Sequence, residues 1–296
     1  MAQQGFQAEI EMLTSCKHSN IITLLGFCDE GRALILIYEY ASNGSLNYYL
    51  QKTRDNENDS WAQRVKICLD IAKGLRYLHT TEGDRHVIVH RDIKSANILL
   101  DENFKGKIGD FGLSIFPSAP GYMDPQYKKD AKLKKESDVY SFGVVMFEML
   151  SGTVAYDRKY AKNNAGLAII ARKHFNNGKI KEMLDPKIKE QTTESLFTSI
   201  KGPSQESLYT FSKIAFECLP KEQVERPTME VVVKELEKAL FFQVSLFSNY
   251  RTLLSHQASH LIFGRLELLI YVKYVNTLNM FYIVIIKYTV YTWFLC

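Results

Sequence analysis

The feature that most constrains the fold of this chain is a polar segment, residues 90–97, set between two apolar runs, residues 87–89 and 98–100. Eight positions hold one carboxylate, one permanent cation, one mobile cation and one amide: Asp92, Arg91, Lys94 and Asn97. Polar groups on a loop between two buried anchors are a common way for a rigid scaffold to position chemistry. The segment therefore predicts a catalytic loop between strand-like elements.

A second carboxylate follows in residues 107–112, which read Lys-Ile-Gly-Asp-Phe-Gly. His-Arg-Asp, then Asn five positions after the Asp, then Asp-Phe-Gly, is the catalytic signature of protein kinases. His-Arg-Asp alone would also fit a solvated charged turn. The two motifs occur in order and at the right separation, so the chain resembles a protein kinase.

The resemblance implies a site for phosphoryl transfer from ATP, in which positioning and charge neutralisation supply most of the catalysis. Asp92 would accept the proton of the substrate hydroxyl, and Lys94 would contact the transferred phosphate as in serine/threonine kinases. Asn97 and Asp110 would hold Mg²⁺. The expected contacts with the nucleotide are the backbone carbonyl of Glu39, the backbone N–H of Ala41, and the residues Leu99, Asn97 and Asp110.

The resemblance also assigns structural and regulatory positions. Glu9 stands where kinases carry the helix glutamate that pairs with the ATP-anchoring lysine, and Tyr38 stands at the gatekeeper position beside the hinge. Arg91 marks kinases whose arginine binds an activation-loop phosphate. Asp138 would cap the backbone of the catalytic loop. The remaining positions are Phe111 and Gly112 of the Asp-Phe-Gly motif, and Arg226, whose usual glutamate partner is replaced by Gln126.

The expected fold class is α+β: a protein-kinase-like two-lobe fold with a partial β N-lobe, residues 1–40, and a mainly α-helical C-lobe, residues 41–243. Residues 1–243 would form the kinase domain. Apolar periodicity predicts the main elements. We expect strands at 21–28 and 33–40, and helices at 6–16, 46–50, 61–79, 137–150 (N-capped), 165–174, 206–218 and 229–240.

Three local sequences narrow the family: Phe-Gln-Ala-Glu-Ile-Glu-Met-Leu, Leu-Leu-Gly-Phe-Cys-Asp-Glu and Tyr-Glu-Tyr-Ala-Ser-Asn-Gly-Ser-Leu. They are similar to plant receptor-like serine/threonine kinases, in particular the malectin-like, Feronia-type branch. That branch implies a protein substrate and a cytoplasmic domain at the plasma membrane of a parent receptor. The mild net charge of +4 indicates no nucleic-acid partner.

The sequence departs from the family in three places. It has no GxGxxG loop and no Val-Ala-Ile-Lys-like strand, so the domain looks N-terminally truncated. The activation segment after Gly112 looks short and carries Ala119 where a threonine is expected, with Ser114 and Ser118 its only hydroxyls before Tyr122. These features leave a second hypothesis open, a catalytically impaired, pseudokinase-like interaction module.

Residues 244–296 differ in character from the rest of the chain. They are rich in Leu, Ile, Tyr, Phe and Asn, and their uncharged stretch at 274–286 is shorter than the roughly 20 residues that a membrane helix needs. Three interpretations remain: a translated non-coding or disordered tail, a membrane-associated segment, or a helix packed on the C-lobe.

Overall fold

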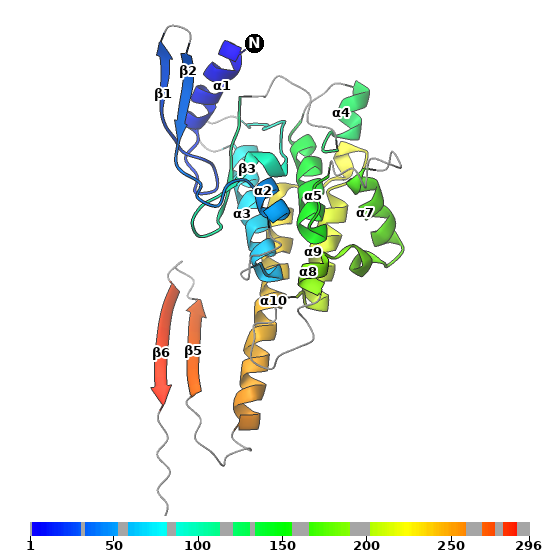
Figure 1. Ribbon diagram of the computed structural model, residues 1–296. Helices are drawn as coiled ribbons and strands as arrows, with labels where there is room; N and C mark the ends of the chain where they lie inside the picture. Colours follow the sequence, from blue (N-terminus) through cyan, green and yellow to red (C-terminus); the bar gives the residue numbers. More distant parts are fainter. Residues whose placement is uncertain are drawn as a thin grey trace, which may run out of the picture. The chain divides into compact units, whose positions relative to one another are not determined.

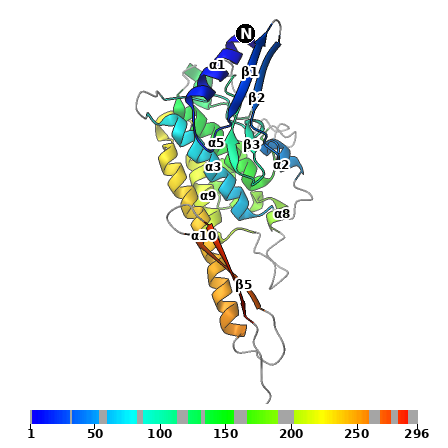
Figure 2. The ribbon, with the colours of Figure 1, turned by 90° about the vertical axis from the view of Figure 1, so that its left-hand side faces the viewer.

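The computed structural model describes residues 2–30, 33–52, 59–81, 87–112, 121–130, 134–155, 166–189, 202–258, 268–275 and 281–288. The chain divides into two compact units, Met1–Phe247 and Ser248–Cys296. The first unit has a small strand-containing part at one end and a helical part that holds most of the core (Figures 1 and 2). This arrangement confirms the α+β, two-lobe class with a partial N-lobe.

The strand-containing part consists of helix α1 (Ala2–Ser15) and an antiparallel pair, β1 (Leu24–Glu30) and β2 (Ala33–Tyr38). Helix α1 packs against both strands, with Phe6 and Phe27 in an edge-to-face contact at 6.2 Å between ring centroids. Figure 2 shows α1 lying beside the two strands at the end of the unit that carries the N-terminus.

Strand β1 begins three residues later than residues 21–28 would predict. Ile21 and Ile22 are apolar enough for a strand, but they pair with another element. The N–H of Ile22 donates to the carbonyl of Ile108 at 2.8 Å, and the N–H of Ile108 donates to the carbonyl of Asn20 at 2.9 Å. These bonds connect the strand-containing part to the segment that ends in Asp110.

The helical part follows the pattern expected from the apolar periodicity. The prediction of a helix over 61–79 is confirmed by α3 (Trp61–His79), which is capped by Ser60. Its other elements are α2 (Leu46–Lys52), a 3₁₀ turn (Ser95–Asn97), β3 (Ile98–Leu100), β4 (Gly106–Ile108), α4 (Pro125–Asp130), α5 (Lys135–Ser151), α7 (Leu167–Asn176), a 3₁₀ turn (Ile180–Met183), α8 (Pro186–Lys189), α9 (Gln205–Glu217), a 3₁₀ turn (Gln223–Glu225) and α10 (Met229–Ala258).

Helix α5 is the centre of the helical part, and its residues from Ser137 to Ser151 are all buried. It contacts α3, α7 and α9 (Figure 1). The expectation that Ser137 caps this helix is wrong. The helix begins at Lys135, and the Ser137 hydroxyl instead donates to the Asp124 carboxylate at 2.7 Å.

Helix α10 continues beyond the predicted end at residue 240 to Ala258. The sequence between these points contains neither Pro nor Gly, so no strong helix breaker ends it earlier. Buried Gln243 belongs to this extension and bonds to the backbone of Gly202 and Ser204. The packed part of the first unit therefore includes residue 243.

The second unit contains an antiparallel hairpin of β5 (Leu268–Val275) and β6 (Phe281–Tyr288). Its register runs from Leu268 opposite Tyr288 to Val275 opposite Phe281. In the described parts of the chain, no helix is both long enough and apolar enough to cross a membrane.

Candidate active site

The backbone of the predicted catalytic loop is held by one buried carboxylate. Asp138 of α5 accepts hydrogen bonds from the backbone N–H groups of His90 and Arg91, each at 2.8 Å, and from Nε2 of His79 at 2.9 Å. Arg91 has φ 73°, a conformation that is unfavourable for a residue with a side chain. The paired bonds to Asp138 offset that strain and fix the loop at the residue before Asp92.

The three predicted catalytic side chains form one bonded cluster. Lys94 Nζ lies 2.6 Å from Asp92 Oδ2, and Asn97 Nδ2 donates to both Oδ2 and the backbone carbonyl of Asp92 at 3.0 Å. Because both donor bonds of the Asn97 amide stay within the loop, its oxygen is the atom left to bind a cation. The carbonyl of Asn97 also accepts the N–H of Gly109, the residue before Asp110, at 2.9 Å, and this bond connects the Asp-Phe-Gly segment to the cluster.

His90 is a buried neutral side chain in this arrangement. Its Nε2 donates to the Gly109 carbonyl at 3.1 Å, while Nδ1 accepts the N–H of Asp92 at 3.3 Å. Burial lowers the pKa of His90 below its usual value, in agreement with a ring that uses one nitrogen as donor and the other as acceptor. The ring packs on Phe111 at 4.6 Å between centroids, so His90 links the two motifs structurally.

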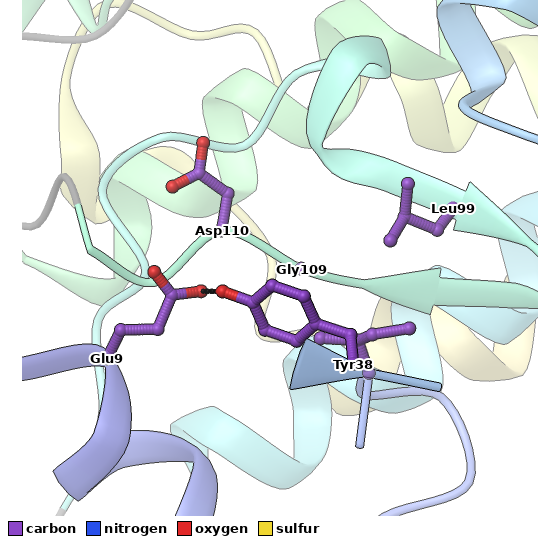
Figure 3. Close-up of a pocket in the computed structure, with 6 residues that line it drawn as sticks. Glu9, Tyr38, Leu99, Gly109 and Asp110 are labelled. Carbon is purple, nitrogen blue, oxygen red and sulfur yellow. Dashed lines mark hydrogen bonds between the residues drawn. The ribbon is translucent and has the colours of Figure 1, made fainter. Parts of the chain in front are cut away.

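A pocket of about 240 Å³ lies between α1, β2 and the end of β4. Its lining residues are Glu9, Ile22, Tyr38, Leu99, Gly109 and Asp110. Figure 3 shows Glu9 and Tyr38 joined by a hydrogen bond, with Leu99 and Asp110 beside them around the same pocket. The structure therefore brings the predicted gatekeeper, helix glutamate and second carboxylate into one place.

Glu9 is buried, and its carboxylate is satisfied without a lysine. The Tyr38 hydroxyl donates to Glu9 Oε1 at 2.7 Å, and the N–H of Phe111 approaches the same oxygen at 3.3 Å. Burial and the Glu9 carboxylate raise the pKa of the Tyr38 hydroxyl, so it remains a donor at neutral pH. Glu9 thus connects α1 to both β2 and the Asp-Phe-Gly segment.

The contact between α1 and the Asp-Phe-Gly segment has a glycine on each side, Gly5 and Gly112. A side-chain carbon at Gly112 would lie 2.7 Å from Glu9 Oε2, and one at Gly5 would lie 2.7 Å from the Gly112 carbonyl oxygen. At Gly5 the neighbouring atom belongs to the backbone, so a larger residue would move α1 or the motif. At Gly112 the neighbouring atom is the end of the Glu9 side chain, which would have to shift away.

Glu39, the predicted hinge residue, forms an ion pair that the sequence did not predict. Both oxygens of its carboxylate lie within 2.9 Å of Lys107 Nζ, and Oε1 also accepts the N–H of Thr23 at 2.8 Å. Ala41, the other predicted hinge contact, accepts the N–H of Gly44 at 3.0 Å through its backbone carbonyl. Lys107 directly precedes Ile-Gly-Asp-Phe-Gly, and a single lysine in that place looks like any exposed strand residue. Sequence reasoning therefore missed its role.

Glu148 of α5 is a buried carboxylate to which the sequence assigned no role. It connects through Tyr122 to the predicted catalytic loop. The Tyr122 hydroxyl donates to Glu148, the N–H of Ala155 donates to it at 2.6 Å, and the Ser95 hydroxyl lies 3.1 Å from the Tyr122 hydroxyl. Oε2 has no hydrogen-bond partner among the described residues. Glu148 thus connects helix α5 to Ser95, the residue after Lys94.

We expect Glu148 to make stability depend on pH. Burial raises the pKa of Glu148 from its ordinary value of 4.5 to about 7. Between these two pKa values Glu148 is protonated in the native state and ionised in the unfolded state. The free energy of unfolding therefore falls as pH rises through this range. The shift corresponds to about 3 kcal/mol. Relative to wild type, Glu148→Gln should gain stability by about that amount from pH 5 to pH 8, measured by urea unfolding.

The control for this prediction is Glu237→Gln, which removes an exposed carboxylate on α10. Its unfolding free energy should stay parallel to that of wild type across the same pH range. A constant difference between Glu148→Gln and wild type at all pH values would contradict the assigned cause.

The partner of Arg226 differs from the expectation. Gln126 stands at the position of the usual partner, but the guanidinium pairs with Asp124, Nη2 to Oδ1 at 2.6 Å, and donates to three backbone carbonyls. Asp124 precedes α4 and can reach the arginine, whereas Gln126 Oε1 accepts the N–H of Gln223 at 2.7 Å. The buried charge therefore keeps a carboxylate partner, two residues earlier in the chain than Gln126.

The activation-segment positions Ser114, Ser118 and Ala119 lie outside the described residues.

Comparisons with known proteins agree with this geometry. The sequence model of the protein kinase domain family matches residues 1–236. Receptor-like protein kinase FERONIA of Arabidopsis thaliana is 38% identical over 265 residues, which cover 84% of this chain and 28% of that protein. Receptor-like protein kinase HERK 1 of the same plant is 39% identical over 258 residues, 82% of this chain and 29% of that protein. The chain therefore spans less than a third of the length of these relatives.

The matched family and the bonded cluster of Asp92, Lys94 and Asn97 lead to the same conclusion. The chain belongs to the protein kinase family, and its domain is of the kind found in receptor-like protein kinases.

Proposed function

We propose that this chain transfers the γ-phosphate of ATP to serine or threonine hydroxyls of a protein substrate. The observation that carries the proposal is the hydrogen-bonded cluster of Asp92, Lys94 and Asn97, connected to the Asp110 segment through the Gly109 N–H. A chain that kept only the fold would have no need to gather a carboxylate, a cation and an oriented amide at one loop.

In this proposal each member of the cluster has a separate task. Asp92 accepts the proton of the substrate hydroxyl, as the loop aspartate does in kinases. Lys94 sits 2.6 Å from that carboxylate and neutralises charge on the transferred phosphate. Asp138 and His90 hold the loop in position, and Arg91, next to Asp92, is the residue that would bind a phosphorylated segment.

The residues present fit a magnesium ion. Asn97 offers an amide oxygen and Asp110 a carboxylate, and Mg²⁺ prefers oxygen ligands of these kinds. Because Asn97 Nδ2 is bonded within the loop, the amide oxygen is the atom of this side chain that would bind the metal. The ion would supply charge neutralisation at the phosphates of ATP.

The adenine side of the site uses backbone groups and one apolar side chain. The carbonyl of Glu39 and the N–H of Ala41 would supply an acceptor and a donor at the hinge. Leu99, which lines the pocket, would supply an apolar surface. Tyr38 closes the back of this site through Glu9, while Phe111 and Gly112 keep the Asp-Phe-Gly segment against α1. Arg226 stabilises the helical part through its buried ion pair with Asp124.

The names of the relatives suggest a wider setting. Residues 1–243 would be the cytoplasmic kinase domain of a receptor-like protein at the plasma membrane, with membrane association supplied by the parent receptor or by residues 244–296. The names of FERONIA and HERK 1 as receptor-like protein kinases support this setting. Signal transduction through phosphorylation of a protein partner follows from the same proposal.

The test is nucleotide binding by the whole chain. We expect MgATP to raise the melting temperature, because a ligand that binds only the native state stabilises it by mass action. At 100 times its dissociation constant the gain is about 2.7 kcal/mol. The same protein should transfer labelled phosphate to a serine- and threonine-containing protein. No shift at millimolar MgATP would contradict the proposal and favour a catalytically impaired interaction module.

A further inference from the structure

The ion pair between Lys107 and Glu39 is partly shielded from solvent and has tight geometry. Lys107 Nζ lies 2.9 Å from Oε1 and 2.8 Å from Oε2 of Glu39. The side chains are 12% and 28% exposed, so the attraction is less screened than that of a surface pair. Lys107 belongs to β4, whereas Glu39 directly follows β2, and the pair therefore connects two separate elements.

Glu39 is anchored by its side chain and its backbone together. Its N–H donates to the Thr23 carbonyl at 3.0 Å, and its carboxylate accepts the Thr23 N–H at 2.8 Å. Partial burial acts to raise the pKa of Glu39, but the hydrogen bonds from Lys107 and Thr23 outweigh it and hold that pKa below its usual value. The carboxylate is therefore charged at neutral pH and can keep the pair intact.

Lys107 is also placed relative to Leu99, which lines the candidate nucleotide site. It lies directly opposite Leu99 in the β3–β4 ladder, and opposite residues of an antiparallel pair share one face. Leu99 lines the pocket that holds Tyr38 and Asp110. Lys107 thus has Leu99 as its cross-strand neighbour and the hinge carboxylate as its charge partner.

We infer that Lys107 is a positioning residue of the nucleotide site, which fixes the hinge at Glu39 relative to Leu99. This inference rests on the proposed function. The adenine ring would need the carbonyl of Glu39 and the N–H of Ala41 in place at the same time as the apolar surface of Leu99. An ion pair that joins the hinge to the strand opposite Leu99 sets that spacing before the nucleotide arrives and lowers the ordering cost of binding.

The groups that move the phosphate are held independently of this pair. Asp92 and Asn97 are bonded to each other, and Asp138 fixes the loop backbone. Loss of Lys107 should therefore weaken binding of ground state and transition state equally, which raises KM and leaves kcat unchanged.

The experiment measures phosphate transfer as a function of ATP concentration for Lys107→Met, which keeps most of the side-chain volume and removes the charge. We expect KM for ATP and the dissociation constant of MgADP to rise roughly tenfold, with kcat changed by less than about twofold. Lys107→Arg should restore both constants to within about threefold of wild type, because a guanidinium can pair with both carboxylate oxygens.

Two further variants separate positioning from general destabilisation. Lys73→Met removes a half-exposed lysine paired with Glu237 on α10 and should leave KM unchanged. Glu39→Gln should raise KM in the same direction as Lys107→Met. The double variant should be little worse than Lys107→Met alone, because both changes remove one interaction.

The outcomes distinguish this inference from the proposed function. A wild-type chain that turns over ATP, with unchanged KM in Lys107→Met, overturns the inference alone. Equal losses in Lys107→Arg and Lys107→Met, or a fall in kcat without a rise in KM, also overturn it. A wild-type chain that neither binds nor turns over ATP contradicts the proposed function and removes the basis of the inference.

Discussion

Replacement of Asp92 by Asn should lower kcat for phosphate transfer by about 10²- to 10⁴-fold, the usual contribution of a positioned general base. The amide has nearly the same shape, but it cannot accept a proton from the substrate hydroxyl at neutral pH. In the structure, Asp92 Oδ2 accepts from both Lys94 and Asn97, so the carboxylate is already oriented by two donors. The measurement is steady-state phosphate transfer with saturating MgATP.

Binding of MgATP should survive this substitution, since Asn97 and Asp110 keep their oxygens. We expect the thermal shift with MgATP to stay close to that of wild type while turnover is lost. The matched control is Asp101→Asn, which changes the same atoms in the turn between β3 and β4, where Asp101 accepts the N–H groups of Asn103 and Lys105. Turnover in that variant should remain within about twofold of wild type. Equal loss in both variants would contradict the role of Asp92.

The clustering of Asp92, Lys94 and Asn97 was predictable from the sequence because these residues are close together in the chain. Residues 90–97 hold the loop within eight positions, and the bonds from Lys94 and Asn97 to Asp92 span two and five residues. A motif of this kind reports local geometry directly. The long helix α3 was predictable for a similar reason, since its apolar period is local.

Contacts between residues far apart in the chain were not predictable in the same way. The pairs Glu39–Lys107 and Glu9–Tyr38 join positions separated by 68 and 29 residues, and neither spacing has a sequence pattern. The prediction that Arg226 faces Gln126 was wrong for a related reason. A family pattern assigns one position, whereas the guanidinium binds whichever carboxylate the fold brings to it, here Asp124.

A second large effect is expected on stability, and it arises from a buried charge cluster around Arg64. Arg64 at the start of α3 is fully buried and pairs with Asp59 at 2.5 Å and with Asp185 at 2.7 Å. It also donates to the Met149 carbonyl at 2.9 Å, and the Tyr49 hydroxyl donates to Asp59 at 2.7 Å. One guanidinium thus connects the segment before α3, the end of α5 and the segment before α8.

Replacement of Arg64 by Leu should lower the free energy of unfolding by about 3–5 kcal/mol, because it leaves two buried carboxylates without their cation. Urea unfolding of the whole chain measures this loss. Arg76→Leu on the same helix is the control, since Arg76 and its partner Glu230 are 39% and 51% exposed. A surface pair of that kind contributes about 0–1 kcal/mol. Similar losses in the two variants would contradict the prediction.

A compensated variant tests whether the loss arises from charge or from packing. If uncompensated charge is the cause, neutralising both carboxylates in the Arg64→Leu background, with Asp59→Asn and Asp185→Asn, should recover more than half of the lost stability. The amide oxygen introduced by Asp59→Asn would still accept from the hydroxyl of Tyr49, and both amides are close in shape to the carboxylates they replace. If the loss instead reflects a cavity, the triple variant should be no more stable than Arg64→Leu, because the missing volume is the same in both.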